Sequence, residues 1–180
     1  WSYIVYGDGT VKIRHTVKPQ GTMPPYLPRI GVTFGLDGSL SNVQWYGRGP
    51  QANYPDRKSG YRLGIWTSTV EDMYEPYLIP QDYGLRTDNR WVRMTDSDGK
   101  GVELSVDHLF NFNAYPFTTD NLTKSQFTYQ LQPQTDRYTL NLDYNTTGVG
   151  CTCVYVLDEY RVRPSSYNRV ITIKPVVPSK

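Results

Sequence analysis

The strongest constraint on this chain is the pattern of its apolar residues, which alternate with polar ones in many short runs. Alternation at every second residue places one face of an extended strand in a core and the other toward solvent. Clusters of Gly, Pro, Asn and Asp separate the runs, and no stretch keeps the period of an amphipathic helix. The pattern therefore predicts an all-β, antiparallel sandwich. Strands are expected at residues 3–6, 10–17, 30–34, 43–46, 61–70, 91–94, 102–106, 126–131, 138–144 and 168–173.

Three local features refine this prediction. His15 shares the apolar face of its strand, so we expect a core or semi-buried histidine rather than a catalytic one. Leu63, Ile65 and Thr67 share one face of theirs. Residues 111–123 are polar and aromatic and are expected to form a surface loop.

Composition bounds the class of protein. A chain of 180 residues fits one domain with a sizeable core. The net charge is +2 with both signs interspersed, which indicates neither a nucleic-acid partner nor an anionic membrane. No apolar run approaches the roughly 20 residues of a membrane helix. Because the chain begins at Trp1 rather than Met, we expect a fragment of a longer protein.

Tyrosine is unusually abundant, with sixteen residues in an aromatic content of 14%. A tyrosine offers a flat apolar face with a hydroxyl at its edge, which suits the apolar face and polar rim of a sugar ring. Strand surfaces are also rich in tyrosine, and for any single residue this structural role is the simpler interpretation.

Two motifs carry the functional signal. The first, GRGPQANYPDR, combines turn residues with charges that a packed loop can pair internally. The second runs from EDMYEPY to IPQDYGLR. Together they hold the motif residues Arg48, Gly49, Pro50, Tyr54, Asp56, Arg57, Tyr74, Pro76 and Arg86.

These motifs resemble the last domain of β-galactosidases of glycoside hydrolase family two. The family commonly has Gly-Pro-x-Glu-x-Tyr-x-Asp-Arg in the first, and Asp-Met-Tyr-x-Pro-Tyr then Pro-x-Glu-x-Gly-x-Arg in the second. Ala52 and Asp82 stand where the family has its two glutamates. The resemblance implies a large two-sheet sandwich like that of galactose mutarotases, here cut at its N-terminal side. The missing strands would leave an exposed sheet edge for another copy or the absent portion.

The resemblance also implies an accessory role. In the family both catalytic glutamates lie in a barrel domain that this chain lacks, together with any Mg and Na ions. We therefore expect no catalytic residue and no cofactor here. The domain would form one wall of the catalytic cleft and support assembly of the enzyme. Its expected partners are the remainder of the parent glycosidase, carbohydrate and further copies in a homo-oligomer. The expected location is a bacterial cytoplasm or periplasm. A separate small subunit is a variant of this arrangement.

A third loop departs from the family pattern. Family members run from Gly-x-Gly-Gly into Asp-x-x-Trp, whose indole stacks on substrate in the barrel. Gly148 and Gly150 match, but Cys151 and Cys153 follow, without a tryptophan. Tyr155 is the candidate substrate-binding residue, although residues 154–157 also fit an ordinary strand. The cysteines are expected to be reduced and partly buried, because their spacing on a strand is at the outer limit for a disulfide.

Two alternatives stay open. A free-standing carbohydrate-binding module would bind sugar by itself. An aldose-epimerase-like enzyme would depend on Arg86 and His108, which must meet across a substrate. The acids Glu71 and Glu75 are interpreted as turn caps or partners of nearby arginines rather than a catalytic pair, and Asp158 and Glu159 would be the next acids to test.

Overall fold

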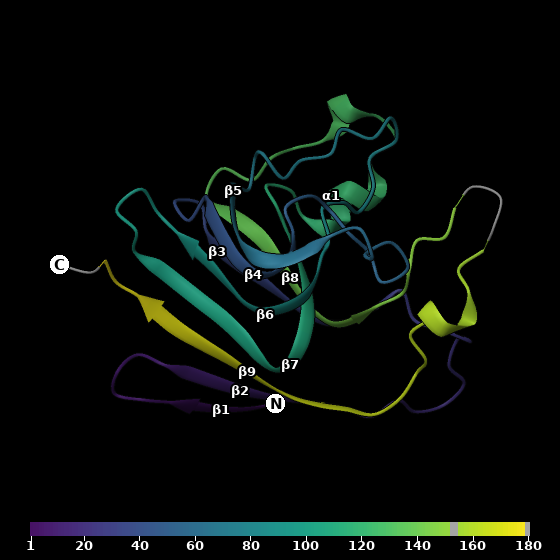
Figure 1. The fold of residues 1–180 in the computed structure, drawn as a ribbon, viewed down its shortest axis with the longest axis horizontal. Helices are drawn as coiled ribbons and strands as arrows, with labels where there is room; N and C mark the ends of the chain where they lie inside the picture. The colour runs from purple at the N-terminus through teal and green to yellow at the C-terminus, as the bar shows by residue number, and fades with distance from the viewer. Residues whose placement is uncertain (152–154, 179–180) are drawn as a thin grey trace.

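The computed structural model describes residues 1–151 and 155–178. Within them the chain forms nine strands that pair antiparallel in one connected, strongly curved sheet, consistent with a β-sandwich (Figure 1). The all-β prediction is confirmed. The strands are β1 (Ser2–Val5), β2 (Val11–Val17), β3 (Arg29–Asp37), β4 (Asn42–Gly49), β5 (Arg62–Thr69), β6 (Arg86–Thr95), β7 (Gly101–Tyr115), β8 (Arg137–Thr146) and β9 (Tyr167–Val176).

The long strand β7 is the branch point of the sheet. Along one path the strand order is β1-β2-β9-β7-β6-β4-β5. The first part of β7, from Gly101 to Val106, pairs with β9, and its last part, from Asn111 to Tyr115, pairs with β8, which in turn pairs with β3. Figure 1 shows the β1–β2 hairpin beside β9, well away from β5. The sheet therefore has three edge strands, namely β1 and β5 at the ends of the path and β3 at the end of the branch.

The main core forms around Trp45 of β4. Val43 and Trp45 alternate inward with the period of the strand and are fully or almost fully buried. The indole meets the ring of Phe112 edge-on at 5.8 Å, and its Nε1 donates to the Arg48 carbonyl at 3.0 Å. Leu142 of β8 belongs to the same core and is completely buried. The core thus links β4 to the strands on both sides of the β7 branch.

Residues 111–131 overturn two local predictions. The expected loop at 111–123 instead continues β7 to Tyr115 and then forms helix α1 (Thr119–Lys124), whose first turn is capped by the Thr118 side chain. The expected strand at 126–131 is instead a single 3-10 turn, η1 (Thr128–Gln130). The Gln130 side chain accepts backbone N–H bonds from Gln126 and Phe127, so these donors are satisfied without a neighbouring strand.

A buried ladder of polar side chains explains how the polar end of β7 stays in the sheet. Asn113 faces Asn141 across β7 and β8, and their side chains are joined by a 3.0 Å hydrogen bond. Asp143 lies in the same row and is 2% exposed, with its Oδ2 accepting no hydrogen bond from the described residues. The nearest cation is Arg29 Nε at 3.6 Å. Opposite it, Gly31 leaves room, since a Cβ there would lie 2.6 Å from Asp143 Oδ1.

The edge strands β1 and β5 expose apolar side chains. Leu63 and Ile65 share one face of β5, as the alternation predicts, and this face is exposed. On β1, Tyr3, Ile4 and Val5 are each more than half exposed. In the part of the chain that the structure describes, no helix has the length and apolar character needed to cross a membrane.

Truncation of the core should be costly. Leu142→Ala removes a completely buried side chain, so we expect the free energy of unfolding to fall by about 2–5 kcal/mol in urea denaturation. Leu78→Ala is the matched control, because Leu78 is 91% exposed and its loss should change stability by less than about 0.5 kcal/mol. Equal effects of the two variants would contradict the assignment of the core.

The buried Asp143 should make stability depend on pH. Burial raises the pKa of Asp143 to about 7, although the charge of Arg29 opposes the shift. A carboxyl whose pKa is raised on folding stabilises most below its unfolded pKa, and this contribution is lost as the pH rises toward 7. Asp143→Asn should therefore gain stability relative to the unsubstituted chain by roughly 1–3 kcal/mol between pH 5 and pH 8. Urea unfolding of both proteins at pH 5 and pH 8 measures this difference in the free energy of unfolding. A difference that is the same at both pH values would refute the raised pKa of Asp143.

Candidate functional site

The first motif loop leaves the end of β4 and is fixed by Arg48. Its Nε donates to Asp88 Oδ2 of β6 at 2.6 Å, and its Nη1 donates to the Tyr61 and Lys58 carbonyls at 2.8 and 3.2 Å. The Gly49–Pro50 peptide bond that follows is cis. Arg48 thus ties both ends of the loop to β6. Its carboxylate partner, Asp88, lies outside the loop, so the expectation that the loop pairs its charges internally is wrong for Arg48.

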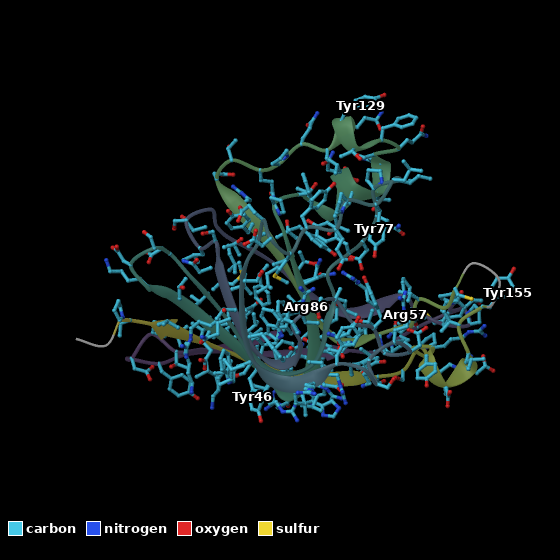
Figure 2. All side chains as sticks on the ribbon, turned by 45° about the horizontal axis from the view of Figure 1, so that its top comes forward. Tyr46, Arg57, Tyr77, Arg86, Tyr129 and Tyr155 are labelled. Atoms are coloured by element: carbon cyan, nitrogen blue, oxygen red, sulfur yellow. The ribbon has the colours of Figure 1, made fainter. Side chains whose placement is uncertain are left out.

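Arg86 joins the two motifs in the interior. Its side chain is 5% exposed, its Nε donates to the Pro50 carbonyl at 3.0 Å, and its Nη1 donates to the Gly84 carbonyl at 2.7 Å. The guanidinium lies over the Trp45 ring at 5.3 Å. Burial lowers the pKa of Arg86 to about 10. Figure 2 shows Arg86 at the centre of the molecule. Because its guanidinium binds a carbonyl of each motif, it fixes the two motif segments relative to each other.

The remaining motif residues close a turn, pack against neighbouring rings or lie at the surface. The Arg57 N–H donates to the Tyr54 carbonyl at 2.8 Å, which closes a tight turn. Burial raises the pKa of the Tyr54 phenol. Tyr74 packs edge-on against Tyr83, with ring centroids 5.2 Å apart, and Pro76 lies in the exposed segment that follows.

Asp56 connects the first motif to the glycine loop. Its Oδ1 accepts the Val149 N–H at 3.0 Å, and its Oδ2 accepts the Gly150 N–H at 2.7 Å. Gly148 permits this approach, because a Cβ there would lie 2.5 Å from the Asp56 carboxyl carbon. Charge-assisted hydrogen bonds of this kind are among the stronger ones. A carboxylate 93 residues away in sequence thereby fixes the start of the loop that carries Tyr155.

Tyr155 lies at an outer extremity of the molecule (Figure 2) and is 91% exposed. Residues 155–157 are not in a strand, and Val154 lies outside the described residues, as does Cys153. Cys151 is a free thiol and is exposed, so the expectation of a partly buried cysteine is wrong for this residue. An exposed ring is the condition that stacking on a sugar requires.

The acidic residues are satisfied locally. Glu71 accepts from the Tyr138 hydroxyl, and Glu75 accepts from the Tyr77 hydroxyl at 2.9 Å, so tyrosines rather than arginines are their partners. Asp158 pairs with Arg161 at 2.6 Å and with Arg163 at 3.5 Å. Glu159 is exposed beside Tyr160.

The two histidines occupy different environments. His15 is 8% exposed, its Nδ1 lies 3.0 Å from the Tyr144 hydroxyl, and burial lowers its pKa, which confirms the predicted semi-buried role. His108 is exposed and lines a polar cavity whose walls do not include Arg86. The meeting of Arg86 and His108 that an aldose epimerase needs would therefore require Arg86 to leave its two carbonyl acceptors.

Sequence reasoning missed Asp88. It is the one non-glycine residue in the described chain with a positive φ, 56°, and it lies where the β6–β7 register shifts between Arg86 and Asn89. Aspartate tolerates this left-handed conformation better than most residues. The only sequence signal for this conformation was the Asp-Asn pair at Asp88, because the residues around it are compatible with a regular strand.

Removal of the Asp56 carboxylate should loosen the glycine loop without unfolding the domain. In Asp56→Ala we expect hydrogen exchange at the Val149 and Gly150 amides to accelerate by at least about tenfold, because two charge-assisted bonds are lost. Asp96→Ala is the matched control, since Asp96 accepts two backbone N–H groups in another turn, both at 2.9 Å. Unchanged exchange at Val149 and Gly150 would show that Asp56 does not hold the loop.

Comparison with known proteins agrees with the motif resemblance. The family model described as the β-galactosidase small chain matches residues 1–173. A β-galactosidase of Priestia megaterium is 33% identical over 97% of this chain, which corresponds to 17% of that protein. Those of Vibrio cholerae and Halalkalibacterium halodurans are 35% and 33% identical over 83% and 82% of the chain, or 14% and 15% of their own lengths.

The chain thus spans about a sixth of the length of the curated relatives it matches. The match covers both motifs, the glycine loop and nearly all strands of the curved sheet. The chain therefore belongs to the β-galactosidase small chain family.

Proposed function

We propose that this chain is the C-terminal accessory domain of a retaining β-galactosidase, which hydrolyses terminal β-galactosides with catalytic glutamates that lie in another part of the protein. Three points support the proposal: the family membership, the names of the relatives, and the fraction of those proteins that the chain represents. The acids Glu71, Glu75 and Asp158 also have local partners of their own.

The observation that carries the proposal is the exposed Tyr155 beside an anchored loop. The Asp56 carboxylate fixes the backbone at Val149 and Gly150, a few residues before a ring that is 91% exposed. In our proposal this loop walls one side of the catalytic cleft, and the Tyr155 ring stacks on a substrate sugar in place of the family's indole.

The proposed partners follow from the same arrangement. The remainder of the glycosidase supplies the barrel, with Mg and Na ions if the parent uses them, and carbohydrate occupies the cleft. The apolar edge strands β1 and β5 are available for that remainder or for a second copy in a homo-oligomer.

The test is hydrolysis of a chromogenic β-galactoside by the chain alone and after mixing with the upstream part of its parent. We expect activity only in the mixture. Tyr155→Ala should lower kcat/KM by about two- to tenfold, the range expected for one lost stacking contact, and Tyr155→Trp should retain activity.

Tyr129→Ala is the matched control, because Tyr129 is 80% exposed on η1, away from the glycine loop (Figure 2). It should leave kcat/KM unchanged. Turnover by the chain alone would overturn the accessory role, and an effect of Tyr129→Ala as large as that of Tyr155→Ala would remove the sugar contact.

The exposed Tyr155 ring also favours a second candidate, a carbohydrate-binding module that acts by itself. This candidate predicts saturable sugar binding at Tyr155 by the isolated chain and no gain of hydrolysis on mixing. The same mixing experiment therefore separates the two functions.

A further inference from the structure

A polar cavity of about 440 Å³ lies beside the first motif loop. Pro55 and Lys58 of the first motif loop form part of its wall, and residues 159–163, which follow the glycine loop, form another part. The start of β6, the middle of β7 and the end of β8 close it with Asp88, His108 and Asn145. Its volume falls within the range of small-molecule sites, about 300–1,000 Å³.

The wall at Asp88 is unusual in its backbone. Asp88 has a φ of 56°, and the β6–β7 ladder shifts register around it. Its carboxylate is held by Arg48 Nε at 2.6 Å and by Lys58 Nζ at 2.8 Å, so the surrounding structure fixes the conformation. Left-handed non-glycine residues and strand irregularities are concentrated at binding sites, where they re-aim side chains.

Several polar groups at the cavity are uncommitted. The side chains of His108, Asn145 and Ser165 make no hydrogen bond to any other residue that the structure describes, and all three are exposed. They offer both donors and acceptors. Tyr160 adds a partly exposed aromatic ring, and Glu159 beside it adds a carboxylate acceptor.

The charges argue against an ionic ligand. Each cation around the cavity already has a carboxylate partner: Lys58 shares Asp88 with Arg48, and Arg161 and Arg163 share Asp158. The Glu159 carboxylate in the wall would repel an anion. For a metal ion, the described residues contain no group of three or more His, Cys, Asp or Glu that could hold one.

We propose that this cavity binds a neutral saccharide of one or two rings, as a second sugar site separate from Tyr155. A ligand rich in hydroxyls uses mixed donors and acceptors together with an aromatic surface, and it needs no net charge. The inference deepens the proposed function, and it rests on that function for the choice of a galactoside. The cavity is lined by the segment that follows the Asp56-anchored loop and not by Tyr155.

Amide NMR titration of the 180-residue chain with lactose tests the proposal. We expect saturable shifts at Asn145, at His108 and in residues 159–163. His108→Ala and Asn145→Ala should each weaken binding by about fivefold, the effect of one lost hydrogen bond. Asn42→Ala is the control, because Asn42 is an exposed asparagine that does not line the cavity, and it should leave the affinity unchanged.

Tyr155→Ala keeps the two proposals distinguishable. It should leave the cavity shifts intact while lowering hydrolysis in the mixture with the upstream part. Absence of saturable shifts, shifts confined to the residues around Tyr155, or the same shifts produced by sulfate would each overturn the saccharide site. If one of these outcomes overturns the saccharide site, lower hydrolysis by Tyr155→Ala in the mixture would still support the accessory role.

Discussion

The desolvated guanidinium of Arg86 is the interaction on which the motif region depends. A buried cation is tolerated only where acceptors and polarisable surface replace its water, and here the Pro50 and Gly84 carbonyls and the Trp45 ring do so. Each carbonyl belongs to a different motif, so the need to solvate one side chain fixes two loops against each other. Trp45 is also the centre of the main core, which couples loop geometry to core packing.

A different solution serves the far end of β7. Asn113 and Asn141 satisfy each other across the strands, whereas Asp143 in the same row retains a carboxylate oxygen without a hydrogen bond. A fully paired ladder stabilises, and one unpaired buried acid offsets part of that gain once it ionises. The polar row therefore specifies the register of β7 against β8, at some cost to stability at neutral pH.

Local signals predicted what depends on local chemistry. The strands expected at 3–6 and 10–17 correspond to β1 and β2, and the face of His15 followed from the period of its strand. The polar end of β7 could not be recognised, because Asn113 is strand-compatible only once Asn141 faces it. The strand prediction at 126–131 was wrong for a related reason. The alternation of Phe127 and Tyr129 indicates a strand, but both rings are exposed and stack on each other at 5.5 Å. The motif residues themselves were found by resemblance, whereas the positive φ of Asp88 had only a weak trace in the sequence.

The link between Asp56 and the glycine loop shows why a sequence motif can remain recognisable while its neighbouring loop changes. Asp56 bonds to backbone N–H groups, which every non-proline residue supplies, so the anchor is indifferent to the side chains that follow Gly150. The two glycines are constrained, since a Cβ at Gly148 would collide with the carboxylate and Gly150 has a positive φ of 61°. The side chains that follow Gly150 can therefore change without loss of this point of attachment. An anchor of this kind lets the surface of a loop vary while the scaffold that carries it stays fixed.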